Sequence, residues 1–133
     1  VRQLSFGTYN QKFKPNRTDA DWLCADEAEL DKYLADPLVR KDISAGLFWE
    51  LLGCMKRTGH SFAYGGLPIL LISGQDDPVG NGGKGVQAIY QRMVAGHENV
   101  TMKLFPGARH DLLHEEQNGA DAARKLIAEW IKG

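Results

Sequence analysis

The chain has 133 residues, and 16 lysines and arginines against 17 aspartates and glutamates give a formal net charge of -1. Apolar residues make up 43% of the chain and charged residues 25%, as in ordinary globular proteins. No stretch approaches the roughly 18 consecutive apolar residues that a membrane-spanning helix needs, so we expect no membrane span. The sequence has no dense cluster of lysine and arginine. This argues against a nucleic-acid or anionic-membrane partner and favours a small or uncharged one.

The two cysteines, Cys24 and Cys54, are far apart in the sequence and form no C-x-x-C pair. This usage is more typical of a reducing compartment than of a disulfide scaffold, so we expect a cytoplasmic protein, although a bridge between the two stays open. The first residue is Val1, and residues 1–10 lack the charged start and apolar stretch of a secretion signal. We therefore expect that the protein is processed or that a segment upstream is missing.

The first half of the chain predicts an irregular arm and then two helices. Residues 1–25 are polar and interrupted by glycine, proline and asparagine, so we assign them no regular structure. Residues 26–35 place acids early and apolar side chains on one face before an Asp-Pro pair, which predicts a short amphipathic helix. A second helix is predicted from the N-cap Ser44 to about Lys56. Its apolar stripe consists of Leu47, Phe48, Leu51, Leu52 and Met55.

The second half predicts a strand, a helix, a strand and a final helix. Residues 69–73 form an unalternating apolar run, which suits a strand covered on both faces in a parallel sheet. Residues 86–95 have helical spacing with Gly96 as C-cap, and residues 100–105 are again rich in strand-forming residues. The last helix is predicted to start at the N-cap Asn118 and to bury one stripe. That stripe consists of Ala123, Leu126, Ile127, Trp130 and Ile131.

This order of elements predicts an α/β fold with parallel strands. Two adjacent parallel strands form a marginal sheet even when helices cover them. We therefore expect the chain to be part of a larger sheet.

Polar residues follow both predicted strands. G-Q-D-D-P comes directly after Ser73, and P-G-A-R-H comes directly after Phe105. Ligands in open α/β sheets bind beyond the carboxyl ends of the strands, and neighbouring strands about 4.8 Å apart would bring Asp77 and His110 into contact there. A carboxylate in that position fixes the imidazole tautomer for proton transfer. Asp76 is the competing acid, although as the first aspartate it better suits the turn.

A structural interpretation of the same residues stays open, in which Asp77 only initiates a turn and His110 is a surface histidine. The order of an acid followed by a histidine, each after its own strand, favours the catalytic interpretation, because α/β-hydrolases place these groups in that order after their serine.

Three stretches resemble segments of one enzyme group. They are DWLCADEAELDKYLADP at residues 21–37, PILLISGQDDPVG at 68–80 followed by GKGV at 83–86, and FPGARHDLLHE at 105–115. As a set they resemble the C-terminal half of the serine α/β-hydrolases of the lysophospholipase, monoacylglycerol lipase and serine aminopeptidase group. The first stretch resembles the lid that covers the substrate crevice in that group. The second carries G-x-x-D, whose acid is Asp77, and the third carries the histidine, His110.

The resemblance implies a fold and a function. The fold would be the C-terminal part of an α/β-hydrolase parallel sheet with a helical lid segment, with arm and lid at residues 1–60 and a βαβα core portion at residues 61–133. The function would be that of a serine hydrolase of carboxylic esters, lipid-like as in lysophospholipases or monoacylglycerol lipases, with a small-molecule ester as substrate. Asp77 and His110 would be catalytic, and such a relay needs no metal or organic cofactor.

One family feature is missing from the sequence. The nucleophile motif G-x-S-x-G, which needs a strand before it and a helix after it, does not occur. Residues 59–63, GHSFA, are a near miss, but Ser61 follows a predicted helix and is expected to be a loop serine. The nucleophile would then lie on an upstream half of the same enzyme, and this chain alone would be inactive. The alternative function is a non-catalytic α/β module, a hydrolase remnant that binds a ligand or a protein.

Two further motifs imitate binding sites. Residues 80–85 match G-x-G-x-x-G, but residues 75–79 separate them from the strand, so we predict a loop that leads into a helix rather than a dinucleotide site. His110 and His114 imitate the zinc motif H-E-x-x-H, but Asp111 replaces the glutamate and no third ligand is evident.

The remaining acidic and apolar residues of note have simpler interpretations. Glu115 and Glu116 are predicted to form a solvated face near the last helix. The stripe between Leu47 and Met55 either lines an acyl-chain groove or is ordinary helix packing, and the same choice applies to Trp22 and Trp49.

Overall fold

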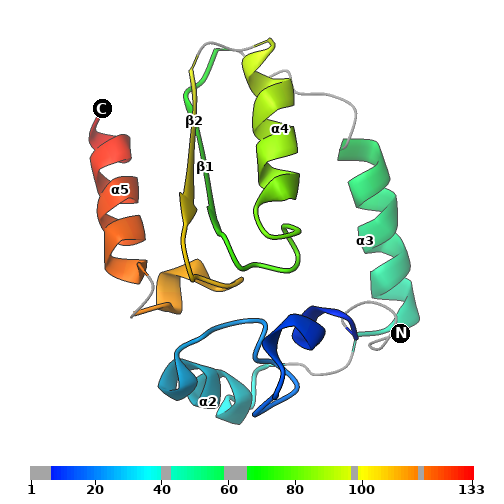
Figure 1. Ribbon diagram of the computed structural model, residues 1–133. Coiled ribbons are helices and arrows are strands. Elements are labelled where there is room, and N and C mark those ends of the chain that lie inside the picture. The colour runs from blue at the N-terminus through cyan, green and yellow to red at the C-terminus, as the bar shows by residue number, and fades with distance from the viewer. Residues whose placement is uncertain (1–6, 40–42, 59–65, 97–98, 117–118) are drawn as a thin grey trace.

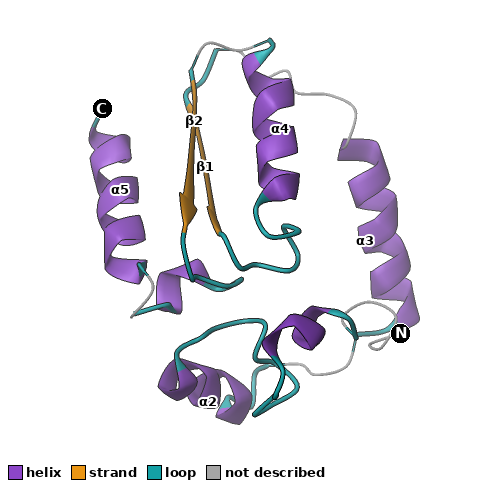
Figure 2. Ribbon diagram, viewed as in Figure 1, coloured by secondary structure: helices purple, strands orange, loops and turns teal. Residues whose placement is uncertain are grey.

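The structure is a computed structural model that describes residues 7–39, 43–58, 66–96, 99–116 and 119–133. A short 3-10 helix and two α-helices precede a strand-helix-strand unit, which a second 3-10 helix and a final α-helix follow (Figure 2). The elements are η1 (Tyr9–Phe13), α2 (Glu27–Ala35), α3 (Ala45–Thr58), β1 (Ile69–Gly74), α4 (Lys84–Val94), β2 (Val100–Phe105), η2 (Leu112–His114) and α5 (Ala120–Lys132).

The two strands pair in parallel, as the sequence predicts. Their register runs from Ile69 opposite Val100 to Gly74 opposite Phe105, so both strands end at the same edge. Figure 1 shows α4 and α5 on opposite sides of this pair, with η1 and α2 beyond the carboxyl ends of the strands. The predicted α/β fold is therefore confirmed, and the segment before α2 lies where ligands bind in such folds.

The buried core lies where α5 and η2 meet the end of β2. Phe105, Ala108, Leu112 and Ala123 form one buried cluster, against which Ile72 and Leu126 pack. Burying a side chain such as phenylalanine contributes about 1.5–3 kcal/mol, so this cluster fixes the chain that leaves β2.

The chain that leaves β2 also lies against the end of β1. A Cβ atom added to Gly74 would stand 2.1 Å from the carbonyl oxygen of Arg109, so only glycine fits there. The backbone N–H of Gln75 donates to the carbonyl of Phe105 at 2.9 Å, and that of Asp76 donates to the carbonyl of Ala108 at 2.9 Å. These contacts fix the two loops against each other.

The N-terminal half differs from the prediction in three places. The arm is not wholly irregular, because Tyr9–Phe13 forms η1, a single short turn without the repeated apolar spacing that would reveal it in the sequence. The first α-helix starts at Glu27, since Asp26 is its N-cap and accepts from the backbone N–H groups of Ala28 and Glu29. Helix α3 continues to Thr58 instead of ending near Lys56.

The C-terminal half agrees more closely, with shifts of one or two residues. Strand β1 includes Gly74, and α4 starts at Lys84 because Gly83, with a φ of 79°, forms its N-cap. Ala95, not Gly96, is the C-cap of α4. The N-cap of α5 is Gly119, and the predicted cap Asn118 lies outside the described residues.

In the view of Figure 1, α3 is drawn on the far side of α4 from the two strands. Its stripe residues Leu47, Leu51, Leu52 and Met55 remain 46–60% exposed, and Trp49 is 75% exposed. Within the part of the chain that the structure describes, this stripe is therefore not buried by helix packing.

No helix formed by the described residues is both long enough and apolar enough to cross a membrane.

Candidate active site

The two loops after the strands bring Asp77 and His110 together. The distance between Oδ2 of Asp77 and Nδ1 of His110 is 3.1 Å. Both residues lie just past the carboxyl ends of paired strands, because Gly74 and Phe105 are opposite each other in the register. The structure thus juxtaposes the two side chains that the sequence singles out, while their catalytic role stays a prediction.

Asp77 is buried and already hydrogen-bonded from the backbone. Its residue is 7% exposed, and Oδ1 accepts from the N–H of Val79 at 2.8 Å. Burial alone would raise the pKa of Asp77, but hydrogen bonds from His110 and from the backbone of Val79 and Gly80 outweigh it and hold the pKa below the ordinary aspartate value. The group is therefore a carboxylate, and the proton between the two side chains belongs to Nδ1 of His110.

His110 is the more accessible partner of the pair, with a side chain that is 40% exposed. The hydrogen bond to Asp77 raises its pKa above the ordinary histidine value, against the opposite effect of burial. Since Nδ1 faces Asp77, Nε2 is the ring nitrogen that can take up a proton.

An aromatic side chain of the arm, here residues 7–25, lies against the imidazole. The Trp22 ring lies with its centroid 5.3 Å from that of His110, and the Tyr9 ring lies 5.2 Å from Trp22. The sequence leaves two interpretations of Trp22 open, an acyl-chain groove or ordinary helix packing. In the structure Trp22 packs against the candidate site and not within a helix, which argues against helix packing.

The competing acid, Asp76, is engaged elsewhere. Its Oδ1 lies 2.6 Å from Nζ of Lys12 in η1, and its side chain is 42% exposed. This geometry favours Asp77 over Asp76 as the partner of the histidine.

The histidine loop, residues 106–111, is tied to the arm by several long-range contacts. The Arg109 guanidinium donates to the carbonyls of Asp21 and Cys24 and lies 4.2 Å from the centre of the Phe13 ring. On the other side of His110, the N–H of Asp111 donates to the carbonyl of Leu23 at 2.7 Å. The arm therefore holds the chain on both sides of the imidazole.

The structure corrects the prediction for Glu115. The sequence predicts this residue on a solvated face with Glu116, but Glu115 is 0% exposed. Its Oε1 accepts from the backbone N–H groups of Ala25 and Arg109, each at 2.9 Å. An acid between polar neighbours resembles a surface residue in a sequence, so only the folded contacts reveal this role.

The glycine-rich segment and the two histidines that resemble a zinc motif make contacts within the fold. Gly82 and Gly85 donate their N–H groups to the carbonyls of Asp77 and Gly80, so the glycine-rich segment is a loop that leads into α4, as predicted. His114 lies in η2 and pairs with Asp111 at 2.9 Å, and no group of metal-ligating side chains gathers among the residues described. Ser61 lies outside those residues.

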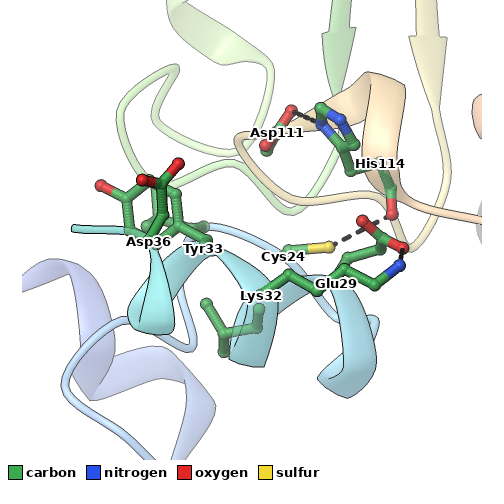
Figure 3. Close-up of a pocket in the computed structure, with 9 residues that line it drawn as sticks. Cys24, Glu29, Lys32, Tyr33, Asp36, Asp111 and His114 are labelled. Carbon is green, nitrogen blue, oxygen red and sulfur yellow. Dashed lines mark hydrogen bonds and ion pairs between the residues drawn. The ribbon is translucent and has the colours of Figure 1, made fainter. Parts of the chain in front are cut away.

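A separate pocket of about 220 Å³ lies between α2 and η2. In Figure 3, Asp111 and His114 lie on one side of it, Tyr33 and Asp36 on the other, and Cys24 between them. Neither Asp77 nor His110 lines this pocket, so it is distinct from the candidate site.

Neither cysteine is in a disulfide, so the bridge that the sequence left open does not form in this structure. Cys24 is buried and Cys54 is exposed. Burial is the main reason that the pKa of Cys24 is raised to about 11, and its Sγ donates to the carbonyl of His114. Cys24 is therefore a thiol that packs against η2.

Three comparisons with known proteins place this geometry in context. The model of a family described as "Serine aminopeptidase, S33" matches residues 2–117. Eleven chains of solved structures match, among them a highly thermostable carboxyl esterase from Bacillus coagulans in complex with glycerol, with a TM-score of 0.84 and 24% sequence identity. That match covers 98% of this chain and 44% of the esterase chain, and at this identity it shows a shared fold. A search of curated proteins found no match.

Proposed function

The chain belongs to the serine aminopeptidase S33 family, and from that premise we propose that it supplies the acid and the base of a serine hydrolase acting on carboxylic esters. The observation that carries the proposal is the contact of 3.1 Å between Asp77 and His110 at the shared strand edge. The solved structure that shares this fold is a carboxyl esterase, which supports the choice of an ester as substrate. A Ser-His-Asp relay needs no metal or organic cofactor.

In the proposed reaction a serine hydroxyl attacks the ester carbonyl while Nε2 of His110 takes the hydroxyl proton. Asp77 holds the ring in the tautomer that leaves Nε2 ready and stabilises the imidazolium that forms. His110 then gives the proton to the departing alcohol, which leaves an acyl-enzyme. Water repeats the two steps, so that the carboxylic acid is released and the serine hydroxyl is restored.

The nucleophile in this proposal comes from polypeptide outside these 133 residues. The absence of G-x-S-x-G from the sequence supports this, as does the coverage of 44% of the esterase chain. The chain alone would then lack esterase activity.

The proposed substrate is lipid-like, as in lysophospholipases and monoacylglycerol lipases. Residues 1–60 would form the arm and lid, and residues 61–133 part of the core. The exposed apolar side chains of α3, at Leu47, Leu51 and Met55, support this choice because a lid that contacts acyl chains needs such a face.

The test is ester turnover in the complete enzyme that carries the nucleophile. Asp77→Asn is expected to lower kcat by about 10⁴-fold with the fold intact, because the amide favours the wrong imidazole tautomer. Asp76→Asn is the matched control, since its side chain pairs with Lys12 and is expected to leave turnover nearly unchanged. Near wild-type turnover in Asp77→Asn would remove Asp77 from the mechanism, whereas a complete wild-type protein without ester turnover would favour the non-catalytic binding module.

A further inference from the structure

Glu115 joins two chain segments that meet at the candidate site. The residue is fully buried, and its Oε1 accepts from the N–H groups of Ala25 and Arg109, each at 2.9 Å. A buried carboxyl group without hydrogen-bond partners destabilises a fold by several kcal/mol, and these two donors help to stabilise the carboxyl group at this position. One oxygen atom thus ties the start of α2 to the histidine loop.

The tie acts at the residue next to His110. Arg109 directly precedes it, and Ala25 comes three residues after Trp22, whose ring centroid lies 5.3 Å from that of the imidazole. A shift of either segment would therefore change the position of the ring relative to Asp77 and Trp22. Hydrogen bonds weaken steeply as their distance and angle depart from the optimum, so a small shift would be felt at the contact of 3.1 Å.

We propose that Glu115 is a positioning residue for His110. One of its carboxylate oxygens holds the backbone of the arm and of the histidine loop, and this fixes the position of the imidazole relative to Asp77 and Trp22. The importance of this for catalysis rests on the proposed function. The positioning itself concerns only residues of this chain, so it can be measured by a readout other than activity.

The experiment follows the His110 ring of the complete protein by NMR as the pH is varied. In Glu115→Ala the His110 pKa is expected to fall toward the ordinary histidine value, in the same direction as in Asp77→Asn, because the contact with Asp77 loosens. Glu115→Gln keeps an acceptor oxygen and is expected to retain the wild-type titration. The charged groups that act on His110, Asp77 and Asp111, are unchanged in both variants.

Glu116→Ala is the matched control, because this neighbouring acid is exposed and pairs with Arg124. It is expected to leave the His110 titration unchanged. A folded Glu115→Ala chain with the wild-type titration would overturn the proposal, as would an equal shift in Glu116→Ala. If Glu115→Ala does not fold, Glu115→Asp, which is one methylene shorter, takes its place, and an unchanged titration there has the same meaning.

The catalytic part is tested separately in the complete enzyme. Glu115→Ala is expected to lower kcat by about 10²-fold with little change in KM, since a misplacement of about 1 Å has effects of that size. An unchanged kcat would overturn the positioning role in catalysis while leaving the proposed function intact. Wild-type turnover in Asp77→Asn, by contrast, would overturn the proposed function itself.

Discussion

The strand pair and the arm hold His110 from two sides by different kinds of contact. On the strand side, backbone groups bond to backbone groups across a fixed parallel register, and Gly74 lets the two loops approach closely. On the arm side, besides one backbone bond from the N–H of Asp111 to the carbonyl of Leu23, the contacts come from single side chains, as Arg109 and Glu115 reach backbone groups 85–90 residues away in sequence. The difference teaches that the two strand-side loops are joined mainly through backbone groups, with a glycine at their closest approach, whereas the arm side relies largely on individual side chains.

Gly74→Ala is the strongest way to break the strand side. The added methyl group would stand 2.1 Å from the carbonyl oxygen of Arg109 and 2.3 Å from that of Ala108, both backbone atoms that cannot turn away. We expect a loss of about 3 kcal/mol or more in the free energy of unfolding, measured by urea denaturation.

Gly96→Ala is the control for this substitution, because nothing lies within 4 Å of its added methyl group. It is expected to change stability by at most about 0.5 kcal/mol. Equal stability of the Gly74 and Gly96 variants would show that the close approach of the two loops is not needed.

Arg109→Ala breaks the arm side instead. It removes the donors to the carbonyls of Asp21 and Cys24 together with the contact to the Phe13 ring. Hydrogen bonds from charged groups contribute about 1.5–3 kcal/mol, and we expect a loss in that range on urea denaturation. The comparison variant is Arg124→Ala, whose exposed guanidinium pairs with Glu116 and Asp121 and donates to the carbonyl of Leu113; a smaller loss is expected there because water screens these contacts. Equal losses in the free energy of unfolding for Arg109→Ala and Arg124→Ala would show that the arm does not depend on Arg109.

The pH dependence of stability tests the contact between Asp77 and His110 separately from the other contacts of the strand side and the arm side. The pKa of Asp77 is lowered on folding, so its contribution is present above the ordinary aspartate pKa and is lost as the pH falls through the folded value. The pKa of His110 is raised, so its contribution is present below the ordinary histidine pKa and is lost as the pH rises through the folded value. The pair therefore stabilises most between these limits, from about pH 4 to about pH 6.5.

The variant that measures this is His110→Gln, compared with the wild type by urea denaturation at about pH 5.5 and about pH 9. The stability difference is expected to be larger at the lower pH. The gain should be about 1 kcal/mol or less, because the imidazole is 40% exposed and water screens the pair. A difference that is the same at both pH values would mean that the two groups do not stabilise each other as ions.

The sequence predicts the strand-helix-strand unit well, for a local reason. The apolar run at residues 69–73 and the strand-forming residues at 100–105 are complete within each element, and a parallel pairing then follows from the intervening helix. The contact between Asp77 and His110 follows in turn, because both loops leave the same edge.

The arm could not be predicted in this way. Its turns and ties depend on partners distant in sequence: Trp22 meets His110, and Glu115 meets Ala25, through contacts that no periodicity encodes. The stripe of α3 presents the opposite case, since its helical spacing is clear but the spacing does not show that Leu47 and Met55 stay exposed. Local patterns thus predict elements and not the surfaces that they meet.

The most direct test of the pair's role is the rate at which a fluorophosphonate labels the nucleophile serine of the complete enzyme. With His110→Ala the rate is expected to fall by about 10³-fold or more, because no base remains to take the hydroxyl proton. His114→Ala, which removes the exposed histidine paired with Asp111, is expected to label at the wild-type rate. Wild-type labelling in the His110 variant would contradict the account.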